Sequence, residues 1–413
     1  MAIEDGFILT KDDRNKIRAN FREALVSALH GKESCLKCLP SFLPRPSGRE
    51  CGQWLALDFG GTNLRAMAVR LAGGKAEILR MKKVSLRKAG AYDLTSNATT
   101  AKELFDAIAY LLLSVTPETG DIFLGHTFSF PARQLSVDKA RLITWTKEFA
   151  VQGVVGEEVN GLLADSLRRC GAERVHPAAI VNDTVGTLLC CAYRDPKTTI
   201  GSICGTGHNT AAVMPDRMLY NLESGNFDIL PVTDYDREID LCSLAPNTQR
   251  LEKMSAGRYL GSIVTLAASE KLSALRSGAE LSGEDLSMIL SDGGASLRTA
   301  TLIEKKFGSR LTQSDCAFLR RLTRAVCSRS AQMVASTYLG ILDVIDPHHD
   351  ETHTIAVDGS LFGKMPMYSD AMARVLAEGL DGARGSAKLV HAGDGSGIGA
   401  AVAASLATAK GRT

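Results

Sequence analysis

The amino-acid sequence predicts an α/β fold with two domains around a cleft, and three observations lead to this prediction. Strand-like segments alternate with amphipathic helical segments along the chain. Residues 55–71 have the pattern of a strand, a glycine-rich turn and a second strand. The same order of elements returns at residues 199–213, although the amino acids differ. We therefore expect two similar halves, each with a phosphate-binding turn and with its chemistry at the carboxyl ends of strands.

The length and composition limit the class of protein. The 413 residues are enough for two domains with their own cores. A hydrophobic content of 45% and a charged content of 23% are ordinary for a globular protein. The net charge of +2 predicts no broad attraction to nucleic acid or to a membrane surface. The sequence shows no apolar run of membrane-spanning length and no secretory signal, so we expect a cytoplasmic location.

The ten cysteines indicate a reducing compartment rather than a disulfide framework. Cys35 and Cys38 have the spacing of metal ligands, but a zinc site needs four ligands and no second pair of cysteines or histidines lies nearby. We expect two ordinary thiols there. Four other cysteines are expected to be small core residues: Cys190, Cys191, Cys204 and Cys242.

Caps and periodicity predict the elements of the first half in order. Thr10 and Asp13 form a capping-box variant before a helix with one apolar face, and Gly31 ends this helix. A proline-rich connector follows at residues 40–46. After the strand–turn–strand segment, the remaining elements expected here are a strand at 77–85, a helix at 99–114, a strand at 121–126, a helix at 156–169 and a strand at 178–183.

In the second half of the chain we expect a second group of strands, followed by a mainly helical region. Strands at 199–204 and 210–213 flank the second glycine-rich turn. Helices are predicted to fill most of residues 250–345. A late strand at 354–358 ends in Asp-Gly-Ser, and an alanine-rich helix covers residues 397–410.

The turn between the first two strands has the residue types of a phosphate site. Gly60 and Gly61 can adopt positive φ and let backbone N–H groups approach an anion. Thr62 and Asn63 add side-chain donors, and Arg65 adds a fixed fork of positive charge. The alternative is an ordinary surface hairpin with a Gly-Gly turn.

Asp58 ends the first of these strands, where its carboxylate can hold the Mg²⁺ of a nucleotide, directly or through water. The segment is not a Walker loop, because the Gly-Lys-Ser/Thr ending is absent. It is not a dinucleotide fingerprint either, because a strand and not a helix follows it.

A second carboxylate stands at the end of a buried strand, in the run Asn182-Asp183-Thr184. Asp183 is well placed there to act as a general base. Alternatively it caps a helix that begins at Thr184, and both roles can hold together.

Scattered polar residues suit a polyhydroxylated ligand, because each sugar hydroxyl can donate to a carboxylate and accept from an amide or ammonium group. Each of them alone is more often an exposed polar residue, and only their occurrence beside two phosphate turns favours a sugar. This set consists of Ser129, Thr146, Lys147, Asn209, Glu223 and Glu252. The turns at residues 205–207 and 394–397 are further candidates for anion binding.

These segments together resemble a hexokinase of the eukaryotic-type hexokinase/glucokinase family, within the sugar kinase/heat-shock chaperone/actin superfamily. The resemblance covers nearly the whole chain in family order. Its stretches are residues 57–65 (Leu-Asp-Phe-Gly-Gly-Thr-Asn-Leu-Arg), 128–131, 145–147, 181–186, 205–207 with Asn209, 221–223, 249–254, 357–361 and 394–397.

The resemblance implies two domains of ribonuclease-H-like (actin-like ATPase) architecture, with mixed five-stranded sheets flanked by helices and a cleft between them. The small domain would comprise residues 36–189 plus 402–413, and the large domain residues 10–35 plus 190–401. The length corresponds to one kinase unit.

The resemblance also implies a reaction: ATP-dependent phosphorylation of the 6-hydroxyl of a hexose, with glucose as the expected sugar and Asp183 as the catalytic base. The implied cofactors are ATP and Mg²⁺, with Asp58 as a metal ligand through water. The implied partners are the hexose and ATP, without nucleic acid or membrane, and the protein would be a monomer or homodimer.

Two sets of site residues follow from the resemblance. The hexose would be bound by Ser129, Phe130, Pro131, Thr146, Lys147, Asn182, Asp183, Asn209, Glu223 and Glu252. The nucleotide would be bound by Asp58, Gly60, Gly61, Thr62, Asn63, Arg65, Gly205, Thr206, Gly207, Gly359, Ser360, Gly395 and Ser396.

Three positions depart from the family pattern. Ser224 stands where the family usually has Trp, His208 where it has Ser or Thr, and Ile398 where it has Lys. Because Ser is small, we expect Ser224 to loosen the sugar end of the site. The preferred hexose stays open.

Two other functions remain as alternatives: a catalytically weak, hexokinase-like sugar sensor, and an ATPase of actin or chaperone type. The presence of Asp183 and of the Asp58 turn counts against the sensor. The sugar-binding set counts against the ATPase.

Overall fold

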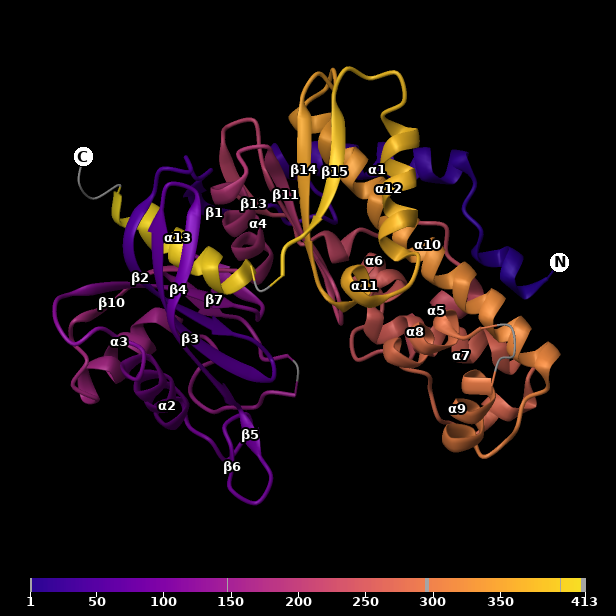
Figure 1. The fold of residues 1–413 in the computed structure, drawn as a ribbon, viewed down its shortest axis with the longest axis horizontal. Coiled ribbons are helices and arrows are strands. Elements are labelled where there is room, and N and C mark those ends of the chain that lie inside the picture. The colour runs from indigo at the N-terminus through magenta and orange to yellow at the C-terminus, as the bar shows by residue number, and fades with distance from the viewer. Residues whose placement is uncertain (1, 147, 294–296, 394, 410–413) are drawn as a thin grey trace. The chain divides into compact units, whose positions relative to one another are not determined.

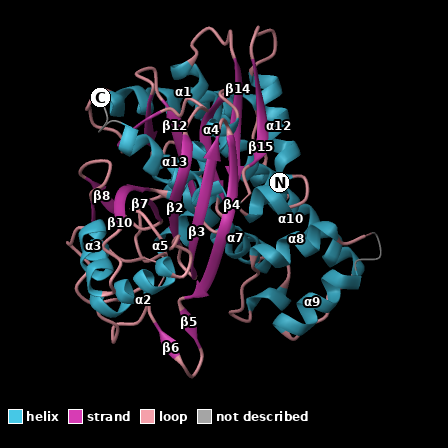
Figure 2. Cartoon of the chain, turned by 60° about the vertical axis from the view of Figure 1, so that its left-hand side comes forward, coloured by secondary structure: helices cyan, strands magenta, loops and turns pink. Residues whose placement is uncertain are grey.

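The computed structural model describes residues 2–146, 148–293, 297–393 and 395–409 (Figure 1). Within these residues the backbone forms a five-stranded sheet, ordered β10-β7-β2-β3-β4, and a six-stranded sheet, ordered β1-β13-β12-β11-β14-β15. Two short hairpins, β5-β6 and β8-β9, are separate from them. Helices flank both sheets (Figure 2), which confirms the predicted mixed α/β class.

The strands of the five-stranded sheet are β2 (Cys51–Phe59), β3 (Asn63–Ala72), β4 (Lys75–Ser85), β7 (Ile122–Phe128) and β10 (Val175–Val181). Those of the six-stranded sheet are β1 (Leu39–Pro44), β11 (Thr198–Cys204), β12 (His208–Val213), β13 (Met218–Asn221), β14 (Thr352–Asp358) and β15 (Ser386–His391). The hairpin strands are β5 (Arg87–Lys88), β6 (Tyr92–Asp93), β8 (Ala132–Gln134) and β9 (Ala140–Leu142).

The α-helices are α1 (Lys11–Leu29), α2 (Ala101–Leu113), α3 (Val159–Arg169), α4 (Asp183–Arg194), α5 (Asp234–Leu241), α6 (Arg250–Ser255), α7 (Gly257–Ser269), α8 (Gly283–Ser291), α9 (Leu297–Phe307), α10 (Gln313–Ile345), α11 (Ser360–Lys364), α12 (Tyr368–Gly379) and α13 (Gly395–Ala409). Short 3₁₀ helices cover Ile3–Phe7, Ser224–Asn226 and Ser273–Arg276. None of the helices in the described ranges is long and apolar enough to cross a membrane.

The chain divides into two compact units. Unit 1 comprises residues 1–38, 202–210 and 222–391, and unit 2 comprises residues 39–201, 211–221 and 392–413. The domain boundaries expected from the sequence, 36–189 with 402–413 and 10–35 with 190–401, stay a prediction.

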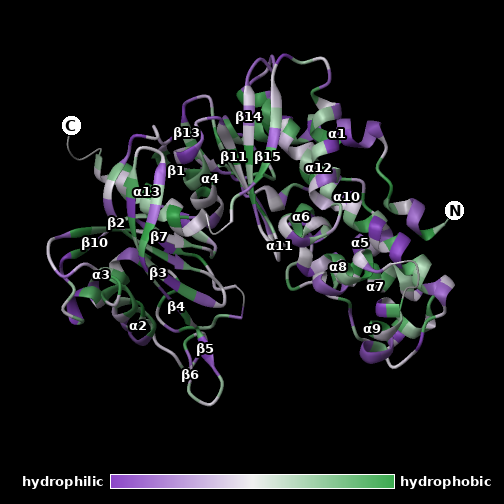
Figure 3. Cartoon of the chain, in the orientation of Figure 1, coloured by the Kyte–Doolittle hydropathy of each residue, from purple (hydrophilic) through white to green (hydrophobic). Residues whose placement is uncertain are grey.

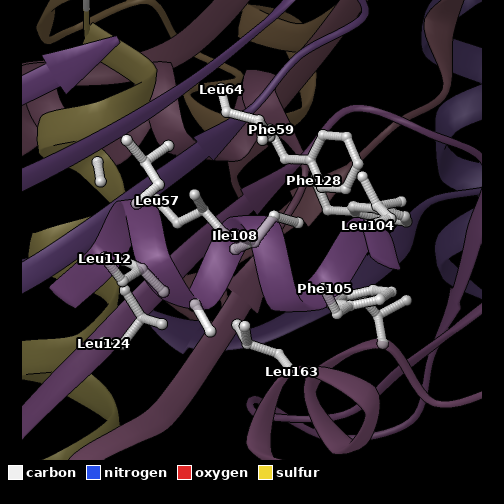
Figure 4. Close-up of a cluster of buried hydrophobic side chains, with 14 of the residues drawn as sticks. Leu57, Phe59, Leu64, Leu104, Phe105, Ile108, Leu112, Leu124, Phe128 and Leu163 are labelled. Atoms are coloured by element: carbon white, nitrogen blue, oxygen red, sulfur yellow. The ribbon is translucent and has the colours of Figure 1, made fainter. Parts of the chain in front are cut away.

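The five-stranded sheet of unit 2 is buried on both faces. Leu55, Leu57 and Phe59 of β2 point into one core with α2 and α3 (Figure 4), whereas Ala56 points into a second core with α4 and α13. Side chains alternate between the faces of a strand, so a strand covered on both sides is continuously apolar. The apolar stretches of β2 and β7 are green in Figure 3.

The six-stranded sheet differs from the expected five strands. The proline-rich segment predicted as a connector forms β1, which pairs antiparallel with β13 through Leu39–Asn221 and Pro44–Met218. Proline has no N–H to donate and is therefore tolerated on an outer strand, which is where β1 lies in the sheet order.

Most predicted elements are confirmed, with boundaries shifted by a few residues. The Thr10 hydroxyl accepts from the Asp13 N–H at 3.1 Å, and the Asp13 carboxylate accepts from the Thr10 N–H at 2.9 Å, which closes the capping box of α1. The last helix, α13, begins at Gly395, two residues before the predicted start. The prediction that Cys242 is a core residue is wrong, because it lies exposed after α5, whereas Cys190, Cys191 and Cys204 are buried.

Helix α13 packs unusually close to its neighbours in unit 2. A Cβ added at Gly399 would lie 1.9 Å from the Gly186 carbonyl oxygen of α4. A Cβ added at Gly125 of β7 would lie 1.7 Å from the Ala400 carbonyl oxygen. Glycine is therefore required at both contacts, and any side chain there would push α13 away from α4 and β7.

We expect Gly399→Ala to lower the free energy of unfolding by about 1–3 kcal/mol, the usual cost of overpacking. Alanine favours a helix over glycine by about 1 kcal/mol, but the contact with Gly186 outweighs this gain. Chemical denaturation measures the difference. Gly6→Ala is the matched control, because a Cβ there meets no atom within 4 Å. Equal stability of the two variants would contradict the close contact.

Candidate active site

The phosphate turn predicted from the sequence joins β2 to β3. Asp58 and Arg65 are direct partners across this hairpin, and Phe59 pairs with Leu64. The Arg65 guanidinium donates to the Asp58 Oδ2 from Nη2 at 2.6 Å and from Nε at 3.0 Å. Asp58 is only 7% exposed, so this ion pair neutralises a nearly buried carboxylate and fixes its orientation.

A threonine that the sequence analysis missed completes the environment of Asp58. The Thr127 hydroxyl of β7 donates to the Asp58 Oδ1 at 2.9 Å. The Thr127 methyl group would lie 2.9 Å from a Cβ added at Gly186 of α4. Thr127 therefore contacts both the phosphate hairpin and the helix that follows Asp183. Its role follows from the parallel pairing of Asp58 with Thr127 in the sheet, which the sequence alone does not reveal.

Asp183 is the first residue of α4, directly after β10. The helix cap is Asn182, whose Oδ1 accepts from the Thr184 N–H at 2.9 Å, so the alternative that Asp183 itself caps a helix starting at Thr184 is wrong. The Asp183 Oδ1 accepts from the same N–H at 2.8 Å and is 3.3 Å from the Thr184 hydroxyl. Asp183 is half-buried, and it lies at the N-terminal, positive end of the dipole of α4.

The first turn of α13 links Asp58 to α4 within unit 2. A Cβ added at Gly397 would lie 3.9 Å from the Asp58 Cβ, and one added at Gly186 would lie 3.2 Å from the Ser396 Cα. Both Gly395 and Ser396 are buried. These two predicted nucleotide-binding residues therefore belong to the same compact unit as the phosphate hairpin and Asp183.

The expected sugar-binding residues of unit 2 differ in exposure. Ser129 follows β7, is half-buried, and its N–H lies 3.4 Å from the Phe59 carbonyl oxygen. Pro131 and Thr146 are exposed. The Phe130 ring is buried among aromatic rings, 4.8 Å from those of Trp145 and Phe149, so its side chain supports the loop from the core. Lys147 and Asp394, also singled out from the sequence, lie outside the described residues.

In unit 1, the second glycine-rich turn lies beside the loop after β14. The Gly205 carbonyl accepts from the Gly257 N–H at 2.8 Å, and the Thr206 carbonyl from the Arg258 N–H at 3.2 Å, so the turn abuts the start of α7. Gly359 has φ +113°, and a Cβ there would lie 2.4 Å from the Cys204 carbonyl oxygen. Only glycine fits at 359, and Gly205 and Gly359 are therefore in contact. Thr206 is exposed.

Three predicted sugar-binding residues of unit 1 meet around Ser224. The Asn209 Oδ1 accepts from the N–H groups of Thr210 at 2.7 Å and Ser224 at 3.2 Å. Glu223, directly before Ser224, has φ +53°, a left-handed conformation that costs energy for a residue with a side chain. The Glu252 Oε2 accepts from the His208 N–H at 2.9 Å. The loop therefore gathers one amide and two carboxylates, all half-buried.

Each unit thus holds part of the expected residue set. Unit 2 contains the phosphate hairpin, Asp183 and the start of α13, whereas unit 1 contains the second glycine-rich turn, the Gly359 loop and the carboxylates of Glu223 and Glu252. Among the described residues, no group of three or more His, Cys, Asp or Glu side chains could hold a metal ion.

The chain matches two family models, both described as hexokinase, over residues 1–193 and 199–406. It is 33% identical to Hexokinase-3 of Mus musculus, covering 97% of this chain and 46% of that protein. It is 32% identical to Hexokinase-1 of Schizosaccharomyces pombe, covering 99% of this chain and 90% of that protein. A hexokinase from Schistosoma mansoni, solved in complex with glucose, superimposes with a TM-score of 0.82 at 29% identity, covering 98% of this chain and 97% of the other.

The two sheets with their flanking helices have the actin-like ATPase fold of the hexokinase structures. The chain belongs to the hexokinase family, as the resemblance predicted. It spans about half the length of the mammalian relatives it matches and nine tenths of the Schizosaccharomyces pombe protein.

We expect Thr127→Val to destabilise unit 2. Valine keeps the methyl group that packs near Gly186 but removes the donor to the Asp58 carboxylate, and a hydrogen bond to a charged group contributes about 1.5–3 kcal/mol. Denaturant unfolding measures the change. Thr323→Val is the control, because the buried Thr323 hydroxyl donates to the Leu319 carbonyl of its own helix and not to a carboxylate of the described residues. An equal loss of unfolding free energy in both variants would show that the hydrogen bond to Asp58 stabilises the protein no more than an ordinary hydroxyl–carbonyl bond.

Proposed function

We propose that this protein transfers the γ-phosphoryl group of ATP to the 6-hydroxyl of a hexose, with glucose as the expected sugar. The sugar oxygen forms the new bond to phosphorus, the bond from phosphorus to the β,γ-bridging oxygen breaks, and ADP leaves. Asp183 takes the proton of the hydroxyl. The observation that carries the proposal is the position of Asp183 in unit 2, where Thr127 and the first turn of α13 link its helix to the phosphate hairpin.

Asp183 suits the role of a general base for two reasons. The Asp183 Oδ1 accepts a hydrogen bond from the Thr184 N–H, so the carboxylate has a fixed orientation. The carboxylate also lies in the first turn of α4, directly after the end of the strand that leads to it. Phosphoryl transfer needs little more from the protein than positioning, charge stabilisation and such a base.

The nucleotide phosphates are assigned to the backbone and side chains of the Asp58 hairpin and to Thr206, and the adenosine to Gly359, Ser360 and Ser396. Mg²⁺, when bound with the nucleotide, neutralises phosphate charge. Asp58 is assigned to the ion through water. Two Arg65 donors already occupy its Oδ2 and Thr127 occupies its Oδ1, which supports an indirect contact over a direct one.

The hexose is assigned to residues of both units. Unit 2 would supply Ser129, Thr146, Lys147 and Asn182, and unit 1 would supply Asn209, Glu223 and Glu252. Carboxylates accept from sugar hydroxyls, whereas the ammonium and amide groups donate to them. The glucose bound to the Schistosoma mansoni relative supports glucose as the sugar.

We expect Asp183→Ala to lower kcat by about 10²–10⁴-fold, the usual contribution of a positioned base. Binding of the hexose, measured by calorimetry, should persist in weakened form. Asp234→Ala is the control, because Asp234 is likewise the first residue of a helix but is exposed on α5. A kcat near that of the wild type in the Asp183 variant would show that another group takes the proton.

A coupled assay of ATP consumption with and without glucose separates the proposed function from its alternatives. A hexose kinase consumes ATP only when the sugar is present and releases hexose 6-phosphate in equal amount. Glucose binding without ATP consumption would favour the sugar sensor. ATP hydrolysis at the same rate with and without glucose would favour an ATPase of actin or chaperone type.

A further inference from the structure

His208, one of the departures from the family pattern, directly precedes Asn209 and contacts Glu252 and Ser224 in unit 1. Resting on the proposed function, we propose that His208 is a positioning residue for the hexose. In this role its backbone holds the Glu252 carboxylate, and its imidazole, together with the Ser224 hydroxyl, fixes the loop that carries Glu223.

The backbone of His208 reaches Glu252 directly. His208 begins β12 after the glycine-rich turn, and its N–H donates to the Glu252 Oε2 at 2.9 Å. A Cβ added at Gly207 would lie 2.9 Å from the same oxygen, and one added at Gly225 would lie 3.1 Å from the Glu252 Cβ. The orientation of Glu252 therefore depends on the precise course of the chain at His208.

The imidazole of His208 is held in one orientation. Its Nδ1 lies 3.1 Å from the Ile203 carbonyl oxygen, and since a carbonyl only accepts, Nδ1 carries the proton. Nε2 then carries no proton, and it packs 3.4 Å from the Ser224 Oγ. Burial lowers the pKa of His208 to about 4, so the ring stays neutral near pH 7.

Ser224 connects this ring to the other sugar-binding residues. Ser224 is fully buried, and its hydroxyl donates to the Thr210 hydroxyl at 3.1 Å. The Ser224 N–H donates to the Asn209 Oδ1, and this bond fixes which side of the Asn209 carboxamide carries the oxygen and which carries the amino group. Ser224 directly follows Glu223, so its buried contacts hold the strained backbone of Glu223 in place.

The pair of His208 and Ser224 changes the expectation that a small residue at 224 loosens the site. His208 is only 4% exposed, and its imidazole packs against Ser224 and supplies bulk there. A fixed set of hydrogen-bonding groups discriminates between sugars that differ in one hydroxyl, because a misplaced hydroxyl leaves buried groups unpaired. Loosening the pair should therefore weaken hexose binding and hexose selectivity while leaving the nucleotide contacts unchanged.

The test compares His208→Ala, His208→Gln and Ser224→Ala with the wild type. We expect the KM for glucose, and the Kd for glucose measured by calorimetry, to rise about 5–20-fold in both alanine variants, which corresponds to about 1–2 kcal/mol by the standard conversion. The KM for ATP should change less than twofold. The ratio of kcat/KM for glucose over mannose should move toward one. His208→Gln should recover part of the loss, because its carboxamide refills part of the buried space and its amino group can donate to the Ser224 Oγ.

His353→Ala is the matched control for the loss of a buried imidazole. His353 is also 4% exposed, lies on β14 of unit 1, and its Nε2 is 3.1 Å from the Asp346 Oδ2. It should lower the melting temperature without changing the Kd for glucose. In the double variant of His208→Ala with Ser224→Ala, the loss should be smaller than the product of the two single losses, because both changes remove one contact.

The outcomes separate this proposal from the proposed function. An unchanged Kd for glucose in Ser224→Ala and His208→Ala would overturn the role of His208, even in a fully active enzyme. Equal rises of the glucose and ATP constants would overturn it as well, because they indicate general loosening. Absence of turnover in the wild type would overturn the proposed function alone, since the binding measurements still decide the role of His208. Absence of glucose binding in the wild type would overturn both.

Discussion

The close approach of α13 to α4 and β7 is the constraint on which unit 2 depends. At Gly399 and Gly125 the backbones come so near that a methyl group would clash with a carbonyl oxygen. This contact places the first turn of α13 between the Asp58 hairpin and the start of α4. The candidate phosphate turn, the candidate base and the Ser396 turn are thus parts of one packed body rather than three independent loops. Because protein interiors are close-packed, a shift at this contact would move all three.

The motif segments and most elements could be predicted from the sequence because their signals are local. The capping box of α1, the hairpin around Asp58 and the alternation of β2 depend on residues a few positions apart. Three features could not be predicted in this way. Thr127 meets Asp58 only through parallel strand pairing, β1 becomes a strand only because β13 offers a partner, and Gly395 joins unit 2 only through the packing of α13. Each depends on contacts between residues far apart in the sequence.

The departures from the family pattern at positions 208 and 224 also show that contacts between distant residues cannot be predicted from local sequence. Taken one at a time, a serine in place of a tryptophan indicates an enlarged site, and a histidine in place of a serine or threonine has no evident meaning. The structure brings the two side chains together, 3.4 Å apart and both buried. Their positions are 16 residues apart on a strand and the loop after a hairpin, so no periodic pattern links them. Paired departures of this kind are understood only when the contact is known.

Backbone strain explains why such support is needed at this loop. Glu223 and Gln249, which precede Ser224 and the helix of Glu252, adopt φ of +53° and +52°. A left-handed residue with a side chain costs free energy of about 1–3 kcal/mol and persists only where its surroundings fix it. The buried Ser224 and the His208 N–H provide fixed contacts on both segments. These contacts leave the two carboxylates little conformational freedom. The binding of a sugar would therefore cost less conformational entropy. The proposed phosphate site is thus fixed by helix packing, whereas the proposed sugar site is fixed by strained turns and a neutral, buried imidazole.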